Sequence, residues 1–162
     1  MAQYKEFKKL PIGVLLDNVR SMDNVGAVFR TADAFLIEKI ILTGITGRPP
    51  HPEIRKTALG AEESVEWTYN SDSVEAITTL KQEGWKICVL EQTHNSIPLQ
   101  NFTPLPQHKY ILVAGNEVEG VKQEIVDMAD YVLEIPQYGV KHSLNVSVSV
   151  GIALWQLIPK PL

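Results

Sequence analysis

Residues 110–120 read Tyr110-Ile111-Leu112-Val113-Ala114-Gly115-Asn116-Glu117-Val118-Glu119-Gly120. The apolar run 110–114 is short and ends at a glycine, which predicts a buried strand. Gly115 and Gly120 then frame a loop, and a helix is expected around residues 121–129. A buried strand followed by a loop and a helix is the repeating unit of a parallel sheet.

The same alternation extends in both directions along the chain. Further strands are expected at residues 13–17, 39–43, 64–69, 85–90 and 131–135. Further helices are expected at residues 24–36, 53–59, 71–83 and 145–157. Residues 95–107, with three prolines, predict an extended connection. The predicted fold class is therefore α/β, with a mostly parallel sheet and helices on both faces.

Composition restricts the class of protein further. The 162 residues predict a single domain over 1–162, and an apolar content of 44% supplies a core. The single cysteine, Cys88, lies in an apolar run and is expected to be a buried structural thiol. No leader sequence and no apolar run near the roughly 20 residues of a membrane span is found, so a cytoplasmic protein is expected.

Ligands of parallel α/β proteins bind beyond the carboxyl ends of the strands. Three such loops follow Asp17, Ala114 and Ile135. In the first, Asn24 is expected to cap a helix whose open first turn, Gly26-Ala27, would admit a phosphate or ribose. Arg30 adds a planar cation. A capped helix with a surface arginine is the simpler interpretation.

The second loop does not fit a nucleotide-phosphate motif. Gly120 is followed by Val121-Lys122, where a P-loop needs Lys and then Ser or Thr. Two glutamates in the loop would also repel a triphosphate. The loop therefore favours hydroxyls, amines or a cationic ligand, unless its glycines only serve a tight turn.

The third loop gathers Ser143, Asn145 and Ser147 at the expected start of the last helix. Capping by Ser143 or Asn145 is the simpler interpretation. His142 is expected on the solvated surface rather than as a general base. The four histidines have no metal-ligand spacing, and no metal site is predicted.

Together the three segments resemble the signature motifs of the SpoU (TrmH-type) branch of the SPOUT RNA methyltransferases. The first motif is similar to Asn24-Val25-Gly26-Ala27 with Arg30-Thr31-Ala32. The second is similar to Gly115-Asn116-Glu117 with Gly120. The third is similar to Ile135-Pro136 with Ser143-Leu144-Asn145-Val146-Ser147. Their order and spacing cover nearly all of residues 12–158.

The resemblance implies S-adenosylmethionine-dependent methylation of a ribose 2′-hydroxyl in RNA, by a homodimer with a C-terminal trefoil knot. It implies a cofactor site formed by Leu90, Gly115, Ile135, Ser143, Leu144 and Asn145. It implies catalytic roles for Arg30, Asn24, Glu117, Ser143 and Asn145, with Arg30 facing the target nucleotide from the partner subunit. Transfer RNA is preferred over ribosomal RNA as the substrate, and no separate RNA-binding extension is expected.

A mechanistic hypothesis follows for Arg30. A guanidinium is not deprotonated in proteins, so a role as general base is difficult to accept. We expect Arg30 to remain cationic, to fix the adjacent phosphate and to stabilise the developing alkoxide. The proton would leave to phosphate or water, with Asn24 and Glu117 positioning Arg30. Two alternatives are a non-catalytic RNA-binding protein on the same fold and an unrelated flavodoxin-like binding module.

Charge is segregated along the chain. The net charge is −4, yet residues 1–60 hold nine basic and six acidic side chains. The expected RNA-facing side chains are Lys5, Lys8, Lys9, Arg20, Arg30, Arg48, Arg55 and Lys56. We expect them to form one face across the dimer, with an RNA affinity that weakens steeply with salt.

Overall fold

The computed structural model describes residues 8–140 and 143–160, and its centre is a seven-stranded sheet in the order β3-β2-β1-β6-β4-β7-β5. The strands are β1 (Leu10–Asp17), β2 (Ile37–Thr43), β3 (Glu66–Asn70), β4 (Trp85–Leu90), β5 (Ile97–Pro98), β6 (Lys109–Ala114) and β7 (Tyr131–Glu134). Every pair of neighbouring strands in this sheet is parallel. The α/β prediction with a mostly parallel sheet is confirmed.

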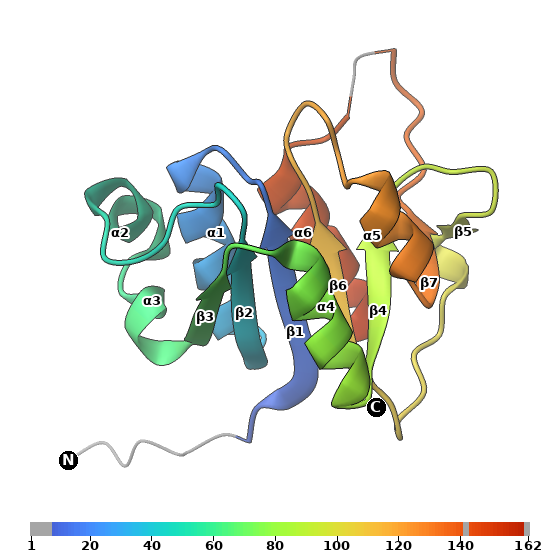
Figure 1. The fold of residues 1–162 in the computed structure, drawn as a ribbon, viewed down its shortest axis with the longest axis horizontal. Helices are drawn as coiled ribbons and strands as arrows, with labels where there is room; N and C mark the ends of the chain where they lie inside the picture. Colours follow the sequence, from blue (N-terminus) through green and yellow to red (C-terminus); the bar gives the residue numbers. More distant parts are fainter. Residues whose placement is uncertain (1–7, 141–142, 161–162) are drawn as a thin grey trace.

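Helices cover both faces of the sheet, as expected (Figure 1). They are α1 (Met22–Ala34), α2 (Pro52–Ala58), α3 (Ala61–Ser64), α4 (Ser73–Gln82), α5 (Gln123–Met128) and α6 (Val146–Leu157). Side chains alternate along β1, so that Val14 and Leu16 join the core beneath α1 and α6 while Leu15 joins the core beneath α4 and α5. No helix of the described residues is long and apolar enough to cross a membrane.

Two parts of the chain differ from the expected elements. The connection expected to be extended contains β5 and a 3₁₀ turn, η1 (Leu99–Asn101). The short helix α3 was also not predicted. β5, η1 and α3 are all too short for the hydrophobic period of a helix or strand to become visible in the sequence. Cys88 is fully buried as expected, and burial raises the pKa of its thiol.

The first helix begins earlier than predicted. Ser21, not Asn24, is the N-cap of α1, because the Ser21 side chain accepts a hydrogen bond from the Asn24 backbone amide at 3.2 Å. Asn24 therefore lies within the first turn and is buried. Its side chain is free to contact other loops.

Gly26 serves helix packing rather than an open ligand site. It is buried on α1 against α2, and an added Cβ would overlap Thr57 Oγ1 and the carbonyl oxygen of Ile54. The expectation that Gly26 leaves room for a phosphate or ribose is therefore wrong. The close approach of the two helices requires the missing side chain.

We expect Gly26→Ala to lower the free energy of unfolding by about 1–3 kcal/mol, because the two helices must move apart. Urea unfolding measures this loss. Gly151→Ala is the matched control, since its Cβ would meet only Thr31 Cγ2 at 3.9 Å, an ordinary contact in a helix. A Gly26→Ala protein as stable as the Gly151→Ala protein would contradict this account of the packing.

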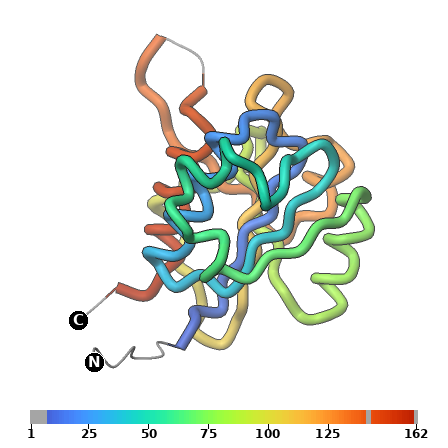
Figure 2. The backbone as a smooth tube through the Cα atoms, turned by 90° about the vertical axis from the view of Figure 1, so that its left-hand side faces the viewer, coloured from blue at the N-terminus to red at the C-terminus, as the bar shows by residue number. Residues whose placement is uncertain are grey.

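Because the strands are parallel, their carboxyl ends all lie at the same end of the sheet. The loops that follow β1, β6 and β7 extend beyond this edge in both views (Figures 1 and 2). These are the three loops at which the sequence predicts ligand binding.

Candidate functional site

A cavity of about 260 Å³ lies at the carboxyl ends of β4, β6 and β7. Five of the predicted cofactor residues line it, namely Leu90, Gly115, Ile135, Ser143 and Leu144. Glu117 lines it as well. Asn145, the sixth predicted cofactor residue, is not among the lining residues. The loops after β6 and β7 therefore meet at one cavity, as the sequence predicted.

The loop Gly115–Gly120 closes on itself. The Asn116 amide donates to the Gly120 carbonyl at 3.1 Å, and the Gly120 amide donates to the Asn116 carbonyl at 2.9 Å. A Cβ on Gly115 would overlap the backbone of Gly120, and Gly120 has a φ of 70°. The tight-turn interpretation is therefore correct for the backbone dihedral of Gly120, whereas Gly115 is required by the close approach of the Gly120 backbone. The same turn forms one wall of the cavity.

Glu117 fastens this loop to the start of α1. Its Oε2 accepts from the Arg20 amide at 3.0 Å, and its Oε1 accepts from the Ser21 amide at 3.0 Å and from Asn24 Nδ2 at 3.2 Å. Burial alone would raise the pKa of Glu117. The hydrogen bonds outweigh burial and hold this pKa below its usual value, because they stabilise the ionised carboxylate.

Asn24 and Asn145 extend this connection to the third loop. Asn145 Nδ2 donates to Asn24 Oδ1 at 3.1 Å. Asn145 Oδ1 in turn accepts from the Ser147 amide at 2.9 Å and caps α6. The capping role expected for Asn145 is confirmed. Glu117, Asn24 and Asn145 form a continuous hydrogen-bonded chain that joins all three loops.

Arg30 lies apart from this chain. It is exposed on α1, about one and a half turns beyond Asn24. Within the described residues, the Asn24 side chain bonds to Glu117 and Asn145, Glu117 also accepts from two backbone amides, and no hydrogen bond joins either of them to Arg30. Their positioning of Arg30, which was predicted to act from the partner subunit, stays a prediction.

The residues predicted to bind RNA are spread over one subunit. Arg20 follows the last residue of β1, whereas Lys8 and Lys9 precede its first residue and so lie at the amino end of that strand. The predicted basic face across the dimer stays a prediction. Lys5 and His142 fall outside the described residues.

The other predicted RNA-binding residues are exposed but differ in their surroundings. Arg48 stacks on Tyr69, with its Cζ 3.9 Å from the ring centroid. Arg55 pairs with Glu62 and Glu63 at 3.7 and 3.4 Å, so its charge is partly neutralised. Lys56 is exposed on α2.

The sequence reasoning missed the contribution of the loop after β4. Glu91 lines the cavity, and its Oε2 accepts from the Val121 amide at 3.0 Å, which holds the end of the Gly115–Gly120 turn. The rule that ligands bind at the carboxyl ends of strands applies to β4 as much as to β6. That rule would have found Glu91.

A parallel sheet with a cavity across the carboxyl ends of three adjacent strands defines an α/β ligand-binding protein. The model of the SpoU rRNA Methylase family matches residues 11–155, and the chain belongs to this family. The resemblance read from the three motifs is confirmed at the level of the family.

Individual relatives act on different RNAs. The chain is 32% identical to a tRNA (guanosine(18)-2′-O)-methyltransferase of Aquifex aeolicus, over 88% of this chain and 66% of the relative. It is 29% identical to a 23S rRNA (guanosine-2′-O-)-methyltransferase of Pseudomonas putida, over 91% and 58%. It thus spans about three-fifths of the length of the curated relatives it matches.

The solved structures agree with the family. The AdoMet-bound rRNA methyltransferase of Sinorhizobium meliloti superposes with a TM-score of 0.83 at 28% identity, covering 90% of this chain and 54% of that chain. The likeness extends over almost the whole of the described fold.

Proposed function

We propose that this chain carries out S-adenosylmethionine-dependent methylation of a ribose 2′-hydroxyl in RNA. The observation that carries the proposal is the hydrogen-bonded chain Glu117–Asn24–Asn145, which ties the three family motifs together beside one cavity. The activities named for the relatives support the reaction type. Between the two classes of RNA, we propose tRNA rather than rRNA as the substrate.

The cavity suits S-adenosylmethionine, which supplies an electrophilic methyl group on a cationic sulfonium. Leu90, Leu133 and Ile135 offer an apolar wall, and the backbone of Gly115 also lines the cavity. Carboxylates of Glu91, Glu119 and Glu134 also line the cavity and favour a cation there. The donor set therefore fits this cofactor.

The protein's own contribution is orientation and electrostatics. The bonded loops hold the cavity wall in place, which favours one geometry for the reacting groups. Arg30, exposed and cationic, would fix the phosphate next to the target ribose and stabilise the developing alkoxide. The hydroxyl proton would leave to that phosphate or to water.

The proposed dimer places Arg30 of one subunit near the cavity of the other. An apolar stripe on and before α6 supports a second copy: Leu144, Val148, Ile152 and Trp155 are 38–54% exposed. Val148, Ile152 and Trp155 recur at three- and four-residue steps, so they share one face of α6, and Leu144 precedes the helix. Phe35, the C-cap of α1, packs on Trp155 with ring centroids 5.9 Å apart, which links the stripe to the helix that carries Arg30.

We expect Ile152→Glu to convert the dimer to a monomer, because a charge in a buried apolar interface is left unpaired. Sedimentation at micromolar concentration measures the mass. Ile45→Glu is the matched control, since Ile45 is 65% exposed and lies outside the stripe. A dimer that survives Ile152→Glu would contradict this interface.

The trefoil knot and the cellular location also belong to this proposal. β7 lies between β4 and β5 in the sheet, and the chain then continues to α6, which packs on β6 and η1. This return past earlier strands is consistent with a knotted C-terminal segment. We further propose that the protein acts in the cytoplasm and that residues 1–162 form a single catalytic domain.

Calorimetry with S-adenosylmethionine tests the proposal. We expect saturable binding at micromolar cofactor, and a loss of binding in Gly115→Ala, whose added Cβ displaces the loop. Absence of binding at about 1 mM cofactor would overturn the reaction class. A protein that binds the cofactor but transfers no methyl group would instead support the non-catalytic alternative.

A further inference from the structure

A second cavity, of about 440 Å³, lies at the β3 edge of the sheet. Its walls are the segment Pro49–Pro52, Arg55 of α2, Glu62 and Glu63 of α3, and Trp67 of β3. It shares no lining residue with the first cavity, which lies across the sheet on β4, β6 and β7. None of the three motifs that define the family site contributes to it.

Glu62 gives this cavity an unusual acceptor. Its side chain is only 9% exposed. Its Oε1 lies 3.7 Å from Arg55 Nε, while its Oε2 is buried and has no hydrogen-bond partner among the described residues. Buried carboxylate oxygens are normally hydrogen-bonded, so an unpaired one favours a ligand that brings an N–H donor.

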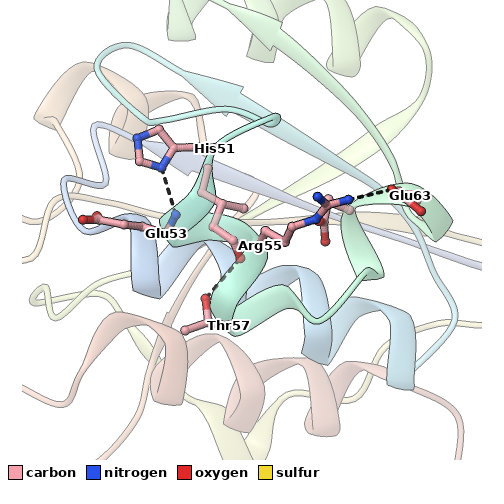
Figure 3. A network of polar contacts seen from close by, with 7 residues as sticks. His51, Glu53, Arg55, Thr57 and Glu63 are labelled. Atoms are coloured by element: carbon pink, nitrogen blue, oxygen red, sulfur yellow. Dashed lines mark hydrogen bonds and ion pairs between the residues drawn. The ribbon is translucent and has the colours of Figure 1, made fainter.

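Figure 3 shows the polar contacts of His51, Arg55 and Glu63 beside this cavity. Arg55 Nη2 lies 3.4 Å from Glu63 Oε1, and both side chains are exposed at the cavity wall. His51 Nδ1 accepts from the Glu53 amide at 3.2 Å and so fixes the imidazole ring. The cavity is thus present without a ligand, although Glu62 Oε2 is buried beside it and becomes accessible only when the Glu62 side chain turns toward the cavity.

The remaining walls are flat and apolar. Trp67 is half-buried and presents an indole, and three prolines add rigid rings. Such walls favour a planar ring that stacks on an aromatic side chain, as unpaired RNA bases do. Arg48 and Lys56 are exposed on the adjoining segments, and their charge favours a phosphate backbone over a cationic peptide.

We propose that this cavity binds a single unpaired guanine nucleotide of the RNA, away from the methylated position. Guanine suits Glu62 because its N1–H and 2-amino groups donate side by side to a carboxylate, with the ring stacked on Trp67. Glu62 would turn toward the cavity as the guanine enters, because its Oε2 is buried in the ligand-free structure. This proposal rests on the proposed function in taking RNA as the substrate. It adds a recognition site at the β3 edge of the sheet, away from the cofactor cavity of the same subunit.

The test follows the indole N–H signal of Trp67 by NMR in the full chain, assigned by its loss in Trp67→Phe. We expect 5′-GMP to shift this signal with saturation at millimolar concentration, and 5′-UMP to bind at least about tenfold more weakly. Inosine monophosphate, which lacks the 2-amino group, should fall between the two.

Substitution of the acceptor provides the control pair. Glu62→Gln should weaken GMP binding by about tenfold or more, because the amide offers one acceptor and no charge. Glu66→Gln, at an exposed carboxylate on β3 outside the cavity walls, should bind GMP like the wild type.

Several results would overturn the proposal. These are no saturable shift at about 10 mM GMP, equal binding of GMP and UMP, or unchanged GMP binding in Glu62→Gln. A shift caused by N-acetyl-lysine amide but not by GMP would assign the cavity to a protein cation and overturn it too. Calorimetry with S-adenosylmethionine separates the two proposals, because cofactor binding does not depend on Glu62 and can persist when the GMP test fails.

Discussion

Replacement of Arg30 by alanine is expected to lower the single-turnover rate of methyl transfer by about 100- to 1000-fold at saturating cofactor and RNA. Arg30 is exposed on α1 and lies outside the cofactor cavity. Its loss should therefore remove stabilisation of the developing alkoxide while cofactor affinity stays near the wild-type value. The measurement is transfer of labelled methyl to RNA, alongside calorimetry of cofactor binding.

Two further variants sharpen this result. Arg30→Lys keeps the charge but loses the planar two-pronged geometry, so we expect it to remain well below the wild-type rate. Lys8→Ala removes an exposed cation before the amino end of β1, at the other end of the sheet from the cofactor cavity. This change should leave the rate unchanged within a few-fold. A near-wild-type rate in Arg30→Lys would contradict the bidentate role.

Glu117→Gln is expected to weaken cofactor binding by at least about tenfold and to lower the free energy of unfolding by about 1–3 kcal/mol. The carboxylate accepts from two backbone amides and from Asn24, and a glutamine cannot serve all three donors. The loop that forms one wall of the cavity would lose its attachment to α1. Glu124→Gln, an exposed change on α5 outside the cavity walls, should leave both quantities near wild type.

The stability effect of Glu117 should depend on pH in a defined direction. Hydrogen bonds hold the pKa of Glu117 in the folded protein below its unfolded value, which is about 4.3. Its contribution is therefore complete above that pH and is lost as the pH falls through the folded pKa. The difference in unfolding free energy between wild type and Glu117→Gln should shrink below about pH 4.3. A difference that stays constant from neutral pH to about pH 3 would contradict this role.

The strands were predictable because burial on both faces leaves continuous apolar runs. Trp85–Leu90 is bounded as expected, with Gly84 in a left-handed turn before it. The start of α1 was not predictable in the same way. Ser21 and Asn24 are both good caps, and local propensity does not choose between them. The hydrogen bond from Asn24 to Glu117 joins residues 93 positions apart, which local patterns do not contain.

The candidate site was predictable to the extent that it follows from sheet topology. The strands predicted to end at Ala114 and Ile135 could be expected to bring the loops that follow them together. Residues of both loops line the cavity. The role of Gly26 was predicted wrongly, because the absence of its side chain is required by packing against α2. The pattern of a single sequence does not reveal which helix packs there. The unpaired oxygen of Glu62 has the same origin, since it results from how α2 and α3 pack.

The decisive measurement is methyl transfer by the purified chain to RNA taken from cells that lack it. With S-adenosylmethionine labelled in its methyl group, we expect label in RNA, located by nuclease mapping on a ribose 2′-oxygen. Comparison of the tRNA and rRNA fractions should place the label chiefly in tRNA. Label on a base, or cofactor binding without any transfer to either fraction, would contradict the proposed function.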